Sequence, residues 1–382
     1  MVILLLLNKS MLAHLNVFIS LALSFTIAYF VIPKIIKVSK KIKLYDVPNH
    51  RSAAKKIVPT LGGIAIFAGF TISTIVSSTS VSIEELKYLF AGVIVMFLIG
   101  LKDDIIGMPA KKKFIVQMVI ALYLVVIANY KISNLHGIFG IQEIGFVWGL
   151  IISVVAIVGI INAVNLIDGI DGLAGGIGLL ASLVYGFWFI NAGDLIYALC
   201  SFSLAGSLIA FLLYNVFGNT NKIFMGDTGS LIVGTIIAVL TIHFNIYQPI
   251  IPGAVHGLPA ISLAIIIVPV IDTIRIFAIR ISQKRSPFSP DMNHIHHNIL
   301  KLTGNHVGTS IIIIAVNGVI ILLSFLLIEE VGNNILFILI LVSGFLLASI
   351  PTYILKGQSN TSIIEGRKSI IGLSIFLKKF KN

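Results

Sequence analysis

The segment FVWGLIISVVAIVGIINAVNLIDGIDGLAGG, residues 146–176, shows the pattern on which most of the chain is built. Its first part, 146–163, is predominantly apolar, and a helix of that length can cross a hydrocarbon core about 30 Å thick. The run lacks the two-residue alternation of a barrel strand and is too long for one. Polar residues then follow at the point where such a helix would leave the membrane.

Similar apolar runs recur along nearly the whole chain, which is 57% hydrophobic and only 11% charged. This composition lies far outside the range of soluble proteins. We therefore predict an all-α, polytopic integral membrane protein with about eleven membrane-spanning helices. The expected spans are residues 11–33, 61–79, 87–101, 113–130, 146–163, 174–191, 195–215, 230–248, 259–278, 310–328 and 334–355.

The basic residues predict the orientation of these spans. The loops alternate between two sides, and one side holds 22 of the 27 Lys and Arg, whereas the other holds only Lys9 and Lys131. Because basic loops stay in the cytoplasm, we expect the N-terminus outside and the C-terminus inside. The cytoplasmic set is loops 34–60, 102–112, 164–173, 216–229 and 279–309 and the basic tail 356–382.

No linker or repeat divides the chain, so we predict one transmembrane domain over residues 1–382. The net charge of +12 lies mainly on the cytoplasmic side, where it suits anionic lipid headgroups. Nucleic-acid binding is not expected, because no soluble domain is present to carry a basic face. Cys200, the only cysteine, lies in an apolar run and is expected to serve packing.

The acidic residues are sorted by type. Five of the six Glu lie on the outer side, whereas eight of the nine Asp lie at or near the cytoplasmic ends of the spans. Short carboxylates among cations at one membrane face predict a site for a metal ion and a phosphorylated ligand. The eight are Asp46, Asp103, Asp104, Asp168, Asp171, Asp227, Asp272 and Asp291.

Asp103 and Asp104 are adjacent and follow the third expected span. Two carboxylates near a membrane are costly unless a cation joins them, and the carbonyl end of a helix also favours a cation. Oxygen ligands suit Mg²⁺ or Mn²⁺ better than Zn²⁺. The alternative is a solvated charged loop that enforces topology.

Two pairs of polar residues end the fifth span. Asn162 and Asn165 are one helical turn apart and share a face. Asp168 and Asp171 repeat that spacing, and each is followed by Gly, so the backbone can approach a ligand closely. With no Lys or Arg beside them, the two carboxylates require a metal or a hydrogen-bonding ligand.

Asp227 opens the eighth span within residues 226–230, Gly-Asp-Thr-Gly-Ser. It could serve only as an N-cap. Alternatively, the free amides of a helix N-terminus would hold a phosphate and leave Asp227 to bind a metal.

A histidine cluster follows the ninth span, where Asp272 and Arg275 are one turn apart and could form a structural ion pair. Zn²⁺ binding lacks support, because no Cys and no helical i, i+4 His pair is present. Donation to phosphate oxygens, or acid–base chemistry near neutral pH, fits better. The residues of this group are Arg280, His294, His296 and His297; the other six His, including His243 and His306, are interpreted as structural.

The loop before the second span combines turn residues, cations and a Gly pair within residues 45–63. It is suited to fold over an anionic ligand. Binding of anionic lipid by the same loop is the alternative.

Taken in order, these motifs resemble the polyprenyl-phosphate N-acetylhexosamine-1-phosphate transferase family over about residues 40–310. The pattern of residues 286–297 is similar to the branch that transfers GlcNAc-1-phosphate to undecaprenyl phosphate. The resemblance implies a UDP-N-acetylhexosamine donor, an undecaprenyl phosphate acceptor, Mg²⁺ dependence and release of UMP. It also implies a bacterial inner (plasma) membrane enzyme whose active site faces the cytoplasm, at the initiating step of a surface polysaccharide such as O-antigen or teichoic acid.

The resemblance further implies roles for single residues. Asp227 would hold Mg²⁺ on the diphosphate, with Asn165 as a second ligand. Asp103 and Asp104 would act at the acceptor phosphate, and Lys111 matches the family's Lys after the aspartate motif. The nucleotide end would be lined by Asn162, Asp168 and Asp171, and the diphosphate or sugar by Arg275, Arg280, His294, His296 and His297.

Relatives commonly carry His where this chain has Ala54 and often Arg where it has Thr60, so no role is carried over to residues 46–63. Phospho-MurNAc-pentapeptide transfer is the alternative within the family. A secondary transporter is a further alternative, but its ionisable residues should lie near the bilayer midplane. The choice of sugar and pathway stays open, as does assembly as a homodimer.

Overall fold

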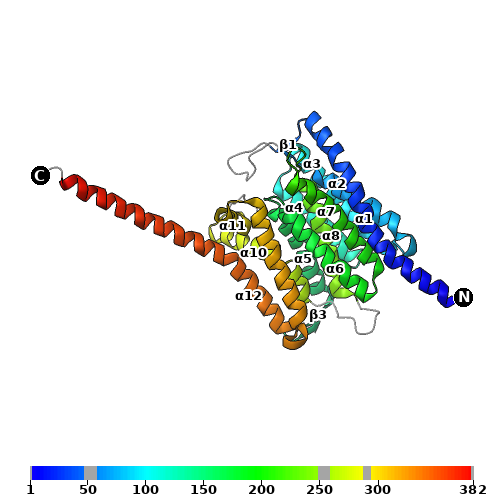
Figure 1. Ribbon diagram of the computed structural model, residues 1–382. Helices are drawn as coiled ribbons and strands as arrows, with labels where there is room; N and C mark the ends of the chain where they lie inside the picture. Colours follow the sequence, from blue (N-terminus) through cyan, green and yellow to red (C-terminus); the bar gives the residue numbers. More distant parts are fainter. Residues whose placement is uncertain (1, 47–57, 248–258, 287–293, 380–382) are drawn as a thin grey trace.

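The computed structural model describes residues 2–46, 58–247, 259–286 and 294–379, and most of these are helical (Figure 1). The C-terminal part of the last helix extends away from the helical body (Figure 1). The helices are α1 (Val2–Lys41), α2 (Gly62–Ser77), α3 (Lys87–Ile106), α4 (Ala110–Val126), α5 (Phe146–Ile167), α6 (Leu173–Ala192), α7 (Leu195–Phe217), α8 (Gly226–Ile246), α9 (Pro259–Ile265), α10 (Ile267–Ser282), α11 (Ile295–Thr303) and α12 (His306–Lys379).

Two short antiparallel hairpins join some of these helices. In the first, β1 (Tyr45–Asp46) pairs with β2 (Val58–Pro59) just before α2. In the second, β3 (Asn134–Ile138) pairs with β4 (Ile141–Glu143), and the Asn334 side chain of α12 donates to the Gly137 carbonyl at 3.0 Å. These strands connect helices and build no layer of their own.

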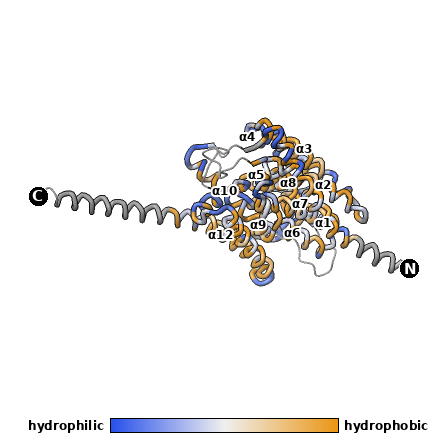
Figure 2. The backbone as a smooth tube through the Cα atoms, turned by 45° about the horizontal axis from the view of Figure 1, so that its top comes forward, coloured by the Kyte–Doolittle hydropathy of each residue, from blue (hydrophilic) through white to orange (hydrophobic). Residues whose placement is uncertain are grey.

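The expectation of a helical, multi-pass membrane protein is confirmed. Within the described residues, six helices are long and apolar enough to cross a membrane, and α9 with α10 would make a seventh. Figure 2 shows largely hydrophobic helices, with hydrophilic segments gathered towards their ends. The expected count of about eleven spans stays a prediction.

The expected boundaries differ from the structure in three places. The span 259–278 is broken at Ile266, because α9 and α10 are bent by 81° relative to each other. Asp103 and Asp104 lie on the last turn of α3 instead of following it, since the helix continues to Ile106. The spans 310–328 and 334–355 are two parts of α12, separated by non-helical backbone at Gly332.

Helix α8 is the buried centre of the bundle, and glycines let α2 and α3 approach its first turn. A Cβ atom on Gly100 of α3 would lie 2.5 Å from the Thr228 Cα atom. A Cβ on Gly63 of α2 would collide with the backbone of Gly229. The amides of Gly62 and Gly63 donate to the carbonyls of residues 224 and 225, each at 2.9 Å. The N-terminus of α8 is therefore fixed between α2 and α3.

Candidate active site

Asp104 of α3 caps the first turn of α8. Its Oδ1 accepts from the Asp227 amide at 2.8 Å, and its Oδ2 accepts from the Thr228 amide at 3.0 Å and the Thr228 hydroxyl at 2.5 Å. Gly226 has φ +72°, and a Cβ there would lie 2.7 Å from Asp104 Oδ2. Both carboxylate oxygens are thus occupied by α8, so Asp104 positions Asp227. Its predicted contact with the acceptor phosphate stays a prediction.

Lys113 of α4 joins the carboxylates of two other helices. Its Nζ lies 2.8 Å from Asp227 Oδ1 and also forms an ion pair with Asp103 Oδ2. The Asn165 amide of α5 donates to Asp227 Oδ1 at 2.6 Å. The structure therefore brings together three predicted residues from α3, α5 and α8.

The sequence interpretation missed Lys113 because it starts the apolar run assigned to the fourth span. Lys111, the predicted residue, is exposed at the start of α4. The signal that could have identified Lys113 is its spacing from Gln117: the two polar residues are one helical turn apart, so they share one face of an otherwise apolar helix.

Asp168 forms the C-cap of α5 and lies close enough to Asp227, Asp104 and Asp171 for their charges to act on it. Among the described residues, none donates a hydrogen bond to its side chain. Burial raises the pKa of Asp168 well above its ordinary value, and the charges of Asp227, Asp104 and Asp171 raise it further. A cation brought to this point would reverse that effect.

Asn162 and Asp171, which were expected at the nucleotide end, are held by protein partners. The Asn162 amide donates to Gln117 Oε1 at 2.7 Å, so it joins α5 to α4. Asp171 Oδ2 lies 2.6 Å from Lys222 Nζ and 3.2 Å from His306 Nδ1. Burial would raise the pKa of Asp171, but His306 and Lys222 outweigh it, and the pKa is lowered.

The histidine cluster is organised by Asp272 of α10. Asp272 accepts from the Ile295 amide at 2.9 Å and from His294 Nδ1 at 3.1 Å, and His296 Nδ1 lies 3.7 Å from it. Arg280 Nη2 lies 3.5 Å from His294 Nε2, so His294 joins Arg280 to Asp272. A Cβ on Gly169 would lie 2.8 Å from His296 Nε2, which places the cluster against the 168–172 loop.

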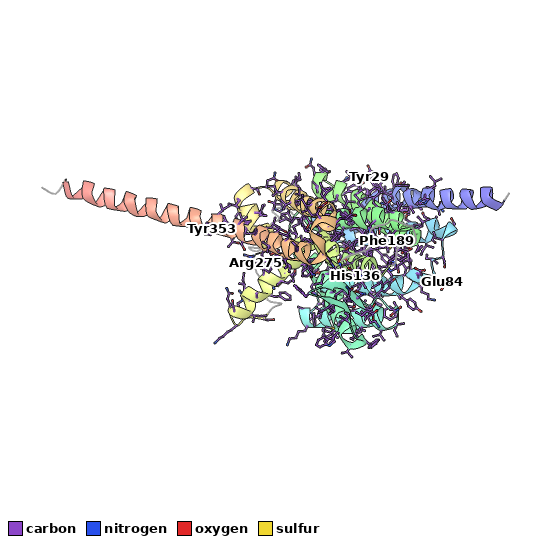
Figure 3. The ribbon with its side chains drawn as sticks, turned by 90° about the horizontal axis from the view of Figure 1, so that it is seen from below. Tyr29, Glu84, His136, Phe189, Arg275 and Tyr353 are labelled. Atoms are coloured by element: carbon purple, nitrogen blue, oxygen red, sulfur yellow. The ribbon has the colours of Figure 1, made fainter. Side chains whose placement is uncertain are left out.

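His297 and Arg275 lie at the edge of this cluster. Burial lowers the pKa of His297 to about 4, and His296 and His294 lower it as well, so the ring is neutral near pH 7. A neutral His297 ring is better suited to accept a hydrogen bond than to act as the predicted acid–base group near neutral pH. Arg275 donates to the Thr352 hydroxyl at 3.0 Å, and Figure 3 shows it close to Tyr353 of α12.

Two groups of side chains offer metal ligands. Asp272, His294 and His296 have ligand atoms within 4.8 Å of one another, a possibility that the sequence interpretation had set aside for Zn²⁺. Asp272 is already hydrogen-bonded to His294, His296 Nδ1 lies 3.7 Å from it, and Arg280 adds positive charge beside them. The set of Asp103, Asp227 and Asn165 offers carboxylate and amide oxygens, which Mg²⁺ prefers, and Lys113 already holds one positive charge between the two carboxylates.

The remaining predicted groups lie outside the described residues. They are residues 47–57, which form most of the loop before α2, and residues 287–293 at the start of the histidine motif, which include Asp291.

The family description "Glycosyl transferase family 4" matches residues 86–245, which span α3 to α8. A relative from Salmonella typhi is 33% identical over 76% of this chain and 77% of its own length. The chain belongs to glycosyl transferase family 4. A second relative, from Yersinia pestis, is 30% identical over 72% of this chain and 74% of its own length. A third, from Haemophilus influenzae, is 34% identical over 68% of this chain and 72% of its own length.

All three family 4 relatives are named undecaprenyl-phosphate alpha-N-acetylglucosaminyl 1-phosphate transferase. The part that matches the family description contains Asp103, Asp104, Lys113, Asn165 and Asp227. The histidine cluster lies after that part.

Proposed function

We propose that this family 4 protein transfers N-acetylhexosamine-1-phosphate, with GlcNAc as the sugar, from a UDP-sugar to undecaprenyl phosphate. The observation that carries the proposal is the meeting of Asp103, Lys113 and Asp227 at the start of α8, although Lys113 and Asp227 are 114 positions apart in sequence. The names of the relatives supply the acceptor and the sugar phosphate.

The proposed reaction is a direct displacement. An oxygen of the lipid phosphate attacks the phosphorus that carries the sugar, and the bond from that phosphorus to the bridging oxygen breaks, so that UMP leaves. At an effective dielectric constant of 20, each pair of unit charges about 4 Å apart repels by roughly 4 kcal/mol. Lys113 offsets part of this repulsion, and positioning and charge neutralisation are what phosphoryl transfer chiefly requires.

A two-step route through a phosphorylated aspartate is the rival mechanism. Asp104 is poorly placed for it, because three donors of α8 occupy its oxygens. Asp103 is paired with Lys113. Isolation of a phosphoryl-enzyme on Asp103 would contradict the direct route.

A divalent cation, Mg²⁺ or alternatively Mn²⁺, belongs to the proposal. Asp227, with Asn165 and Asp103 beside it, would hold the ion, which would neutralise charge on the diphosphate of the donor. Asp104 keeps Asp227 in place through the first turn of α8.

We further propose about eleven spans, a length-based count in which α2, α3 and α4 each cross once, α9 and α10 cross together and α12 crosses twice. The site would then face the cytoplasm of a bacterial cell, in its inner membrane. The Met108→Cys variant tests this orientation, because the natural Cys200 is buried and should not react. Labelling of the introduced cysteine by an impermeant reagent from the outer side would show that the orientation is the reverse of the one proposed.

The activity is tested with UDP-GlcNAc labelled in the sugar and undecaprenyl phosphate. Label that becomes extractable into organic solvent supports transfer. A panel including UDP-GalNAc and UDP-MurNAc-pentapeptide identifies the donor. Uptake of label into vesicles, without labelling of lipid, would show that the protein is a transporter and not a transferase.

A further inference from the structure

Two carboxylates in one short loop have opposite surroundings. Asp171 is paired with Lys222 and His306, and the exposed fraction of its side chain is only 12%. Asp168, three residues earlier, accepts no hydrogen bond from any residue in the described part of the chain. One carboxylate is held by the protein, whereas the other is left for a ligand.

The backbone around Asp171 is fixed as well. The Ser310 hydroxyl of α12 donates to the Asp171 carbonyl at 2.7 Å. The Gly172 amide donates to Asn215 Oδ1 at 2.7 Å, and the Asn215 amide donates in turn to the Ile223 carbonyl at 2.9 Å. The loop is therefore tied to α7, to α12 and to the segment that leads into α8.

Lys222 lies in that last segment, five positions before Asp227. Its Nζ also lies 5.7 Å from the centre of the Phe224 ring, within the range of a cation–π contact. The Phe224 amide donates to the Pro59 carbonyl at 2.8 Å, which anchors the segment against β2. The ion pair of Lys222 with Asp171 thus sets the spacing between the 168–172 loop and the first turn of α8.

We propose that Lys222 and His306 are positioning residues that determine the affinity for the nucleotide-sugar donor, by holding the 168–172 loop at a fixed distance from Asp227. This inference rests on the proposed function, with the diphosphate of the donor at Asp227 and its nucleotide end at the 168–172 loop, as the resemblance implies. Neither residue needs to touch the donor, because both act through Asp171.

The contact is more than a surface ion pair. Exposed pairs contribute little because water screens them. Here the side chains of Lys222 and His306 are only 28% and 24% exposed, and both face the same oxygen of Asp171. Removing Lys222 leaves a poorly solvated carboxylate with one partner fewer, so the loop is expected to shift.

The test compares Lys222→Met with the wild type in the purified full-length protein. We expect the KM for UDP-GlcNAc to rise about tenfold, the scale seen when a supporting residue is lost, with kcat changed by less than about threefold. The KM for undecaprenyl phosphate should not change. Lys222→Arg, which keeps the charge, should restore the donor KM to within about threefold of the wild type.

Lys87→Met is the matched control, because Lys87 forms an exposed ion pair with Glu84 in a different part of the bundle. Its kinetic constants should equal those of the wild type. His306→Gln is the second variant and should raise the donor KM in the same direction. Inhibition by UMP, measured in parallel, should weaken by the same factor as the donor KM rises.

A double variant separates action through Asp171 from a general loss of structure. If Lys222 acts through Asp171, then Asp171→Asn combined with Lys222→Met is no worse than Asp171→Asn alone. Additive losses, an unchanged donor KM, or equal increases in both KM values would overturn the inference while leaving the transferase activity established. Absence of lipid labelling by the wild type would instead refute the proposed function, and the inference with it.

Discussion

At each end of α8 an acidic side chain is paired with a cationic or titratable one, yet the two ends are built differently. At the end of the helix, His243 Nε2 lies 2.7 Å from Asp194 Oδ2, and its ring stacks on Tyr197 with 3.4 Å between ring centroids. At its start, Asp227 shares Lys113 with Asp103, and Asp168 is left without a partner among the described residues.

The difference indicates that the His243 end anchors the helix, whereas the Asp227 end serves the reaction. The His243 end is closed: Asp194 also accepts from the Tyr197 amide and so caps α7, and the Tyr197 hydroxyl pairs with that of Tyr130 at 2.5 Å. The Asp227 end holds several carboxylates around one ammonium group, an arrangement that a cationic or phosphorylated ligand would complete. The predictions below test whether activity depends on the start of α8 alone.

Asp227→Asn should have the largest effect, a loss of roughly 10³-fold in kcat, because it removes the charge that faces the transferred group. Lipid labelling by the purified variant measures this. Its control is His243→Gln, on the same helix. Turnover at the wild-type rate by Asp227→Asn would show that Asp227 takes no part in the reaction.

Lys113→Met should cost about 10²-fold in kcat, as expected for a charge that stabilises a transition state. Asp103 and Asp227 would then repel each other without an intervening ammonium group. Lys111→Met serves as a comparison for an exposed neighbour on the same helix. If the loss followed Lys111 instead, the placement of Lys113 would be wrong.

His297→Ala should cost about tenfold in kcat/KM, the usual lower scale for a positioned acid, base or hydrogen-bonding group. Because the pKa of His297 is lowered to about 4, the ring stays neutral above about pH 6. The ratio of wild-type to variant rates should therefore be constant from about pH 6 to about pH 9. A ratio that changes through neutrality would show that His297 titrates there.

The dependence on Mg²⁺ should itself depend on pH. Because the pKa of Asp168 is raised, its carboxyl is increasingly protonated as pH falls, and protons then compete with the cation. The concentration of Mg²⁺ for half-maximal rate should rise a few-fold from about pH 8 to about pH 6. Asp168→Asn, assayed at its residual rate, should show a flatter dependence; an identical slope would exclude Asp168 as the titrating group.

His243→Gln should have the smallest effect on activity, within about twofold, but should lower the free energy of unfolding by about 1–3 kcal/mol. The reason is that Asp194 stays buried without its partner. Thermal unfolding in detergent measures the loss. A large fall in kcat without loss of stability would mean that this end of α8 also serves the reaction.

Much of the fold follows from local sequence patterns. Apolar length predicted the helices, and the one-sided placement of Asp predicted that carboxylates from different spans would meet, as Asp103 and Asp227 do at Lys113. The break at Ile266 was missed although the sequence marks it: Pro269 has no amide to donate to the carbonyl of Ile265, the last residue of α9, so one helix cannot continue unbroken through this run.

The partners within the site could not be predicted in the same way. Asp104 bonds to Thr228 across 124 positions and Lys222 to Asp171 across 51, and no local periodicity reports such pairs. Gly63 and Gly100 were needed for the close approach of α2 and α3 to α8, but their steric role is visible only once the helices are placed.

The most direct test of the central claim is the initial rate of sugar-phosphate transfer from UDP-GlcNAc to undecaprenyl phosphate by the purified protein, first in excess EDTA and then after addition of Mg²⁺. If the carboxylates at the start of α8 hold a divalent ion, we expect no transfer in EDTA and full recovery of the rate with Mg²⁺. An equal rate in both conditions would contradict the account.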